Sequence, residues 1–150
     1  GTIHFNDTAG SMARDSVTIA SSVVRMITGK NLSDYDVHIN VVGGGNIDGP
    51  SAGAAITCAI ISALTGKPLR QDIAVTGEIS LSGRIKPVGG IAEKAFGAHQ
   101  GGMKAILIPK QNAPDMGSEY MHMKVITVDT IQDILEHMLV RKKQKMKGSK

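Results

Sequence analysis

The sequence predicts an α/β domain, a single compact unit with a mixed sheet and helices packed around it, and three observations support this. Stretches with apolar residues at helical spacing alternate along the chain with short stretches rich in Val, Ile and Thr. Between residues 73 and 86, turns containing glycine separate three of the short stretches, which is typical of hairpin-connected strands in a mixed sheet. The 150 residues, 41% of them hydrophobic, are enough to build one core, so we expect one domain over residues 1–140.

The first half of the chain predicts two helices and one strand. A helix is expected over residues 11–28, where apolar side chains recur at helical spacing and Gly29 supplies a stop signal. Alternating apolar and polar residues predict a strand over residues 35–42, which runs into three consecutive glycines. The next helix covers residues 51–64 and is apolar or small at nearly every position, which indicates a buried central helix.

The second half of the chain predicts mostly strands, with two further helices. A helix over residues 91–100 ends at a glycine pair, and a loop is expected over residues 109–118. The last helix, over residues 130–140, is amphipathic and has Asp129 or Thr130 as its cap. Strands are predicted by short apolar runs between turns, and they cover residues 73–76, 78–81, 84–86, 105–108 and 124–128.

The positive charge of the chain is concentrated at its end. The net charge is +4, but six of the 17 basic residues lie in residues 141–150, which leaves 11 basic against 13 acidic residues in the body. We interpret this segment as a basic C-terminal tail. We expect no nucleic-acid binding through the domain, because with 3% aromatic residues it lacks a platform on which bases could stack. No apolar run reaches the roughly 20 residues of a membrane-spanning helix, and the first ten residues lack the pattern of a secretory signal.

Cysteine and histidine usage narrows the chemistry further. Cys58 is the only cysteine and lies in an apolar stretch, which indicates a core residue and a reducing compartment such as the cytoplasm. The five histidines are scattered without an H-E-x-x-H or C-x-x-C pattern, so no metal site is expected.

The most unusual segment, V-G-G-G-N-I-D-G-P-S-A-G at residues 42–53, joins a predicted strand to the buried helix. Its glycines are compatible with a phosphate cradle, although no G-x-x-x-x-G-K-[ST] motif occurs in the chain. Residues 49–53 also match the G-x-S-x-G pattern of a nucleophile elbow, with Asp115 and His122 available for a triad. A third interpretation pairs Ser51 with a lysine that acts as its base.

A lysine can take the proton of a serine only when its pKa falls from about 10.4 toward ~7, which requires apolar surroundings. Lys94 is the lysine with such a setting, since helical spacing places it beside Ile91 and Ala98, with Ala95 next to it. The periodicity alone leaves open that this lysine extends to water along small neighbours.

Three ordered motifs resemble one known family. The chain has D-G-P-S-A-G at residues 48–53, T-G-E-I at 76–79 and P-V-G-G-I-A-E-K-A at 87–95, and these look like the proteolytic domain of the Lon ATP-dependent proteases. The similarity extends from about residue 10 to residue 140. Two departures concern the strand and loop before the serine, where the chain has His38-Ile39-Asn40 in place of His-x-His and N-I-D-G at residues 46–49 in place of Pro-Lys-Asp-Gly.

The resemblance implies a role for each matched residue. Ser51 would be the nucleophile and Lys94 the general base of a Ser-Lys dyad, with Thr76 orienting the lysine amine and Asp48 matching the acidic residue of the active-site loop. The backbone of Gly49, Pro50 and Ser51, helped by the N-terminus of the helix that begins there, would stabilise the oxyanion of the tetrahedral intermediate.

At the level of the whole protein, the resemblance implies a serine endopeptidase that hydrolyses unfolded polypeptides, works as a homo-hexamer and is located in the cytoplasm. It also implies further strands and an ATPase module upstream of this chain, and ATP and Mg²⁺ would act in that module, so no cofactor is expected here. Two alternatives stay open: a non-catalytic ring-assembly module with the same fold, and a Ser-His-Asp hydrolase built on the G-x-S-x-G pattern.

Overall fold

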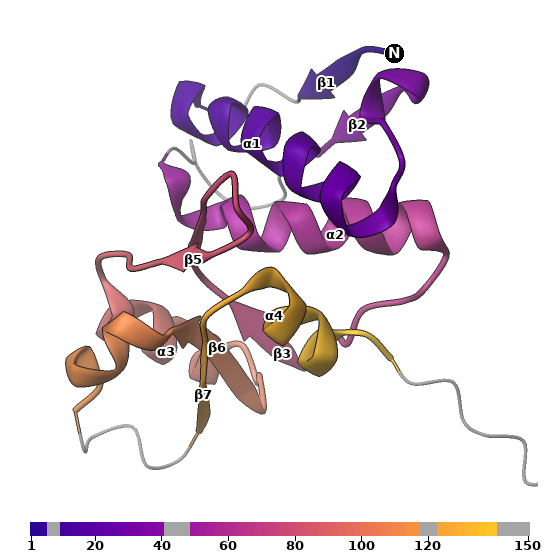
Figure 1. The fold of residues 1–150 in the computed structure, drawn as a ribbon. Helices are drawn as coiled ribbons and strands as arrows, with labels where there is room; N and C mark the ends of the chain where they lie inside the picture. Colours follow the sequence, from indigo (N-terminus) through magenta and orange to yellow (C-terminus); the bar gives the residue numbers. More distant parts are fainter. Residues whose placement is uncertain (6–9, 41–48, 118–122, 141–150) are drawn as a thin grey trace, which may run out of the picture.

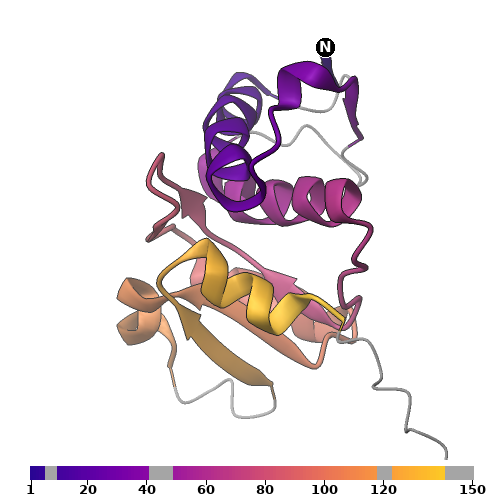
Figure 2. The ribbon, with the colours of Figure 1, turned by 45° about the vertical axis from the view of Figure 1, so that its right-hand side comes forward.

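A central helix separates two parts of the molecule. The computed structural model describes residues 1–5, 10–40, 49–117 and 123–140. Helix α2 (Gly53–Thr65) crosses the middle of the molecule, with α1 (Ser11–Thr28) and two short strands above it in Figure 1. The β3-β6-β7 sheet, with α3 (Ile91–Gln100) and α4 (Ile131–Met138), lies below, and Figure 2 shows the same arrangement from another side.

Local signals in the sequence set the ends of the helices. Helix α1 has the predicted bounds, and Gly29 ends it in a left-handed conformation with φ 73°, its N–H donating to the Arg25 carbonyl at 2.9 Å. Helix α3 also has the predicted bounds. Of the two candidate caps of α4, Thr130 is the one observed: its side chain accepts from the Asp133 N–H, and the Asp133 carboxylate accepts from the Thr130 N–H.

Parallel and antiparallel pairing both occur, divided among three small sheets in the described ranges. Strands β3 (Ile73–Val75), β6 (Ala105–Pro109) and β7 (Lys124–Val128) form a parallel sheet with β6 in its centre. The expected hairpin consists of β4 (Glu78–Ile79) and β5 (Ile85–Lys86), which pair antiparallel. Strand β2 (Val37–Ile39) pairs in parallel with β1 (Ile3–Phe5), a strand too short to produce a recognisable period in the sequence.

Strand β6 is buried along its whole length because helices cover both faces of its sheet. Its residues Ala105 and Leu107 belong to the larger core cluster, which includes side chains of α1, α2 and α4. Ile106 and Ile108 point to the opposite face and belong to a second cluster, with Ile91 of α3. Helix α3 is therefore packed on the face of the sheet opposite α4.

Two segments differ from the sequence-based expectation. Residues predicted as loop after β6 form a 3-10 helix, η3 (Lys110–Asp115), whose Asn112 side chain is buried. The strand predicted over residues 35–42 extends only over Val37–Ile39 among the described residues, and residues 41 and 42 lie outside them.

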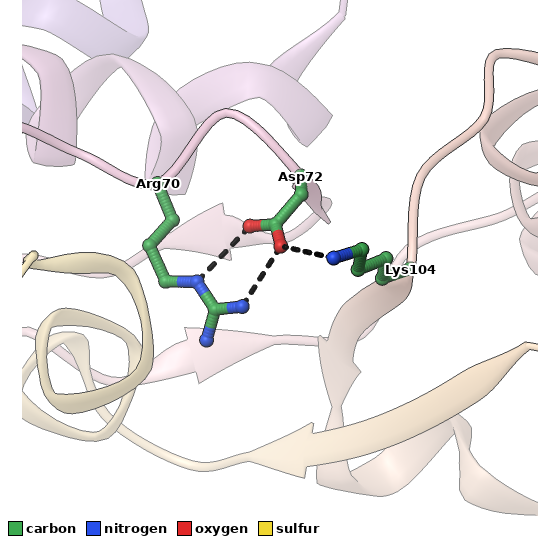
Figure 3. A network of polar contacts seen from close by, with 3 residues as sticks. All are labelled: Arg70, Asp72 and Lys104. Atoms are coloured by element: carbon green, nitrogen blue, oxygen red, sulfur yellow. Dashed lines mark hydrogen bonds and ion pairs between the residues drawn. The ribbon is translucent and has the colours of Figure 1, made fainter.

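An exposed charge network lies at the start of the parallel sheet (Figure 3). The Arg70 guanidinium donates to both carboxylate oxygens of Asp72, at 3.0 and 2.8 Å, and Lys104 approaches the same carboxylate from the other side, with N–O 3.9 Å. Because these groups face solvent, the ion pairs contribute little to stability. The backbone bond from the Lys104 N–H to the Asp72 carbonyl, at 2.8 Å, lies next to the parallel pairing of β3 with β6.

Candidate active site

Ser51 lies in a short 3-10 turn, η2 (Pro50–Ala52), that leads directly into α2. The turn follows Gly49, whose φ of 112° is a conformation that other residues rarely adopt. Pro50 occupies the first position of the turn and has no backbone N–H, so it shapes the chain and cannot donate to an oxyanion. The Ser51 side chain is half-buried at the amino end of a mostly apolar helix.

The Thr76-Gly77 segment is attached to the serine turn by two backbone hydrogen bonds. The Gly77 N–H donates to the Ser51 carbonyl at 3.0 Å, and the Ala54 N–H donates to the Gly77 carbonyl at 3.1 Å. A Cβ atom at Gly77 would lie 2.6 Å from the Ile85 side chain, so only glycine allows this close approach. Thr76 is buried, and its N–H donates to the Leu107 carbonyl of β6 at 3.1 Å.

Lys94 projects from the first turns of α3. Ile91 and Ala95 on the same helix are buried against the sheet, while Lys94 itself is half-buried. Burial lowers the pKa of the Lys94 amine below its ordinary value, because the charged form loses hydration. The apolar setting predicted from helical spacing is therefore present around this lysine.

One pocket of about 390 Å³ brings Ser51, Thr76 and Lys94 together. These three contribute the only polar side chains among the described residues that line it. The remaining lining residues are apolar or small, and they are Ala52, Ala55, Ala74, Val75, Gly97, Ala98, Gly101, Met103 and Ile106. Among these described groups, no hydrogen bond joins the Ser51 hydroxyl to the Lys94 amine, nor the Thr76 hydroxyl to that amine.

The other candidate residues are not assembled in this pocket. Asp48 and His122 lie outside the described residues. Asp115 is exposed at the end of η3 and accepts a hydrogen bond from Asn112 at 2.7 Å, so it does not line the Ser51 pocket. The described part of the chain contains no group of three or more His, Cys, Asp or Glu side chains suited to hold a metal ion. Among the described helices, none is long and apolar enough to cross a membrane.

Two residues near the pocket, Gly77 and Asn112, were not singled out from the sequence. Gly77 belongs to the T-G-E-I motif, but its contact with Ser51 joins segments that are distant in the chain. Asn112 falls in the segment expected to be loop, where an asparagine is common, and its burial depends on the folded structure.

The fold and the pocket define an α/β domain in which a serine and a half-buried lysine with a lowered pKa share one mostly apolar cavity. Residues 1–141 match the family described as Lon protease (S16) C-terminal proteolytic domain. The chain belongs to this peptidase family.

Relatives from bacteria and archaea agree with this assignment. The chain is 40% identical over 146 residues to the Lon protease of Haemophilus influenzae, covering 90% of this chain and 18% of the relative. It is 43% identical to Lon protease 2 of Bacillus subtilis, covering 87% and 23%, and 39% identical to the archaeal Lon protease of Archaeoglobus fulgidus, covering 89% and 22%. The chain thus spans about a fifth of the length of these relatives.

Proposed function

We propose that this domain is a serine endopeptidase in which Ser51 is the nucleophile and Lys94 is its general base. The observation that carries the proposal is the composition of the pocket: a serine, a threonine and a lysine contribute its polar side chains among the described residues, in an otherwise apolar lining. A serine hydroxyl needs a base nearby, and a lysine acts as one only when it is uncharged. Burial favours the uncharged amine of Lys94.

The reaction proceeds through an acyl-enzyme. The Ser51 oxygen attacks the peptide carbonyl carbon as its proton passes to the neutral Lys94 amine, and a tetrahedral intermediate forms. When the peptide C–N bond breaks, Lys94 returns the proton to the departing amine. Water, deprotonated by the same lysine, then attacks the acyl-enzyme, and Ser51 recovers its proton as the carboxylic acid product leaves.

The backbone next to Ser51 supplies the donors for the oxyanion. Gly49 and Ser51 have N–H groups at the amino end of the η2–α2 segment, where the helix dipole favours negative charge. Pro50 has no such donor. Thr76 lies in the same pocket and is proposed to orient the Lys94 amine, and Asp48 is proposed as an acidic residue of the active-site loop.

We extend the proposal to the whole protein on the basis of its relatives, which are named as proteases. Its substrates would be unfolded polypeptides, and it would act as a homo-hexamer. ATP and Mg²⁺ would act in a separate ATPase module, as the resemblance to the Lon ATP-dependent proteases implies. The single cysteine, buried and free, supports a reducing compartment such as the cytoplasm.

The test uses a fluorophosphonate probe, which phosphonylates a reactive serine with loss of fluoride, and intact mass spectrometry. The wild-type chain should gain the mass of one probe adduct, located at Ser51 by peptide mapping. Ser51→Ala and Lys94→Met should abolish the adduct and any peptide cleavage while the far-ultraviolet circular dichroism spectrum is unchanged. The exposed positions Ser33 and Lys104 provide the matched controls, and Ser33→Ala and Lys104→Met should label at the wild-type rate. Wild-type labelling of either pocket variant would refute the dyad.

A further inference from the structure

The side chain of Asn112 forms two hydrogen bonds with the backbone of Val88, as a neighbouring strand would. Asn112 lies in η3, is only 3% exposed, and binds both backbone groups of Val88. The Val88 N–H donates to Oδ1 of Asn112 at 2.9 Å, and Nδ2 of Asn112 donates to the Val88 carbonyl at 2.9 Å. Nδ2 also donates to the Asp115 carboxylate at 2.7 Å, so both hydrogens of the buried amide have an acceptor.

Val88 lies in the short segment that leads into α3. The residues between β5 and α3 form neither helix nor strand, and α3 begins after Gly90, which has φ 69° and provides no side-chain cap. Val88 packs against the cluster that includes Ile91 and Ala95 of the same helix. The two bonds from Asn112 therefore restrain the point at which this ten-residue helix starts.

Lys94 is connected to the segment before α3 by a backbone hydrogen bond. Its backbone N–H donates to the Gly90 carbonyl at 3.0 Å, and its side chain enters the pocket that contains Ser51. A shift of the helix start moves the amine relative to the serine, and misplacement by about 1 Å can cost on the order of 100-fold in rate. We propose that Asn112, through its paired hydrogen bonds to Val88, is the positioning residue that sets where the Lys94 amine lies, an inference that rests on the dyad proposed above.

The amine has no charged neighbour in the described pocket that could compensate for such a shift. The lining contributed by α2, β3, β6 and α3 contains no carboxylate and no second cation among the residues described. Glu93 and His99 of α3 are exposed, and Asp115 of η3 is bonded to Asn112. The protonation of the half-buried Lys94 thus depends on how deeply its side chain is held, and a displaced helix start would expose it further to water.

The experiment measures the rate of Ser51 phosphonylation by the fluorophosphonate probe as a function of pH, together with unfolding by urea. Asn112→Ala should lower the rate at neutral pH about 10- to 100-fold and move the rising limb of the profile to higher pH. Asp115→Ala leaves both Val88 bonds in place and should keep the wild-type limb. Thr130→Ala removes the side-chain cap of α4, away from the pocket. This variant should lower the free energy of unfolding without moving the rising limb of the pH–rate profile.

Each outcome decides one question. If Asn112→Ala is destabilised to the same degree as Thr130→Ala but its pH–rate profile rises at the same pH as that of the wild type, Asn112 has a structural role only. The inference is then wrong. If Asn112→Ala does not fold, Asn112→Ser, which is uncharged and too short to make both Val88 hydrogen bonds, decides in its place by the same shift of the rising limb. If Lys94→Met itself labels at the wild-type rate, the dyad fails, whatever the result at Asn112.

Discussion

The backbone N–H of Gly77 donates to the carbonyl oxygen of Ser51 at 3.0 Å, across 26 positions of sequence. The bond ties the serine turn to the segment that carries Thr76, which itself bonds to β6. The proposed nucleophile and the residue proposed to orient its base are thereby attached to one another by the main chain. This attachment requires a residue without a side chain at position 77, because a Cβ there would meet Ile85 at 2.6 Å.

Gly77→Ala should therefore reduce both stability and reactivity. The added methyl group overpacks a buried site, and we expect a loss of about 1–3 kcal/mol in the free energy of unfolding, measured in urea. The rate of Ser51 labelling should also fall, because the turn must move away from Ile85. Gly89→Ala is the control, since a Cβ at Gly89 meets nothing within 4 Å. Equal stability and labelling of Gly77→Ala and wild type would contradict this account.

Lys94→Met should stabilise the domain at neutral pH, and the gain should shrink as the pH rises. Burial lowers the pKa of Lys94 in the folded state, so the unfolded chain binds more protons between that lowered pKa and the ordinary value of about 10.4. The stability of the wild type therefore rises with pH across this window, whereas a methionine contributes no such dependence. The measurement is urea unfolding of both proteins between pH 7 and pH 10. A stability difference that does not change with pH would mean that Lys94 is fully hydrated.

The capping box of α4 should contribute stability that is lost in acid. The Asp129 N–H and then the Thr130 N–H donate to Asp133, and these bonds lower the pKa of its carboxyl. The contribution is present above the unfolded value of about 3.9 and is lost as the pH falls through the lower folded value. Asp133→Asn should thus be less stable than wild type at pH 7, and the two should converge near pH 2. Glu136→Gln, exposed on the same helix, should follow the wild type throughout.

Cys58 should report on opening of the core. Its thiol is 1% exposed, and burial raises its pKa to about 12, so the reactive thiolate is suppressed in the folded state. Iodoacetamide at pH 8 should therefore modify the native chain only as fast as the core opens, and urea should accelerate the reaction in parallel with unfolding. A cysteine placed at the exposed neighbouring position, Ala59→Cys in a Cys58→Ala background, should react at once. Rapid modification of Cys58 without urea would show that α2 is not stably packed.

Local patterns predicted the helices well because the signals that start and stop them lie within a few residues. Gly29 ends α1 through its own left-handed conformation, and Thr130 caps α4 through neighbouring backbone groups. The half-buried state of Lys94 also follows from its helical neighbours Ile91 and Ala95. By contrast, β1 has three residues and no detectable period, and its pairing depends on a strand more than 30 positions away.

By itself, the order of amino acids predicted the α/β alternation and the bounds of α1 and α3. Its motifs, through their resemblance to a known family, predicted one serine and one lysine as the candidate chemistry. Only the tertiary structure decided that these two side chains share a pocket with Thr76. It also decided that Gly77 bonds to the serine turn and that the Asn112 side chain hydrogen-bonds the backbone of Val88. Periodicity reports contacts within a helix turn or a strand, whereas these contacts join side chains and backbone brought together by the packing of α2 and α3 against the sheet that contains β6.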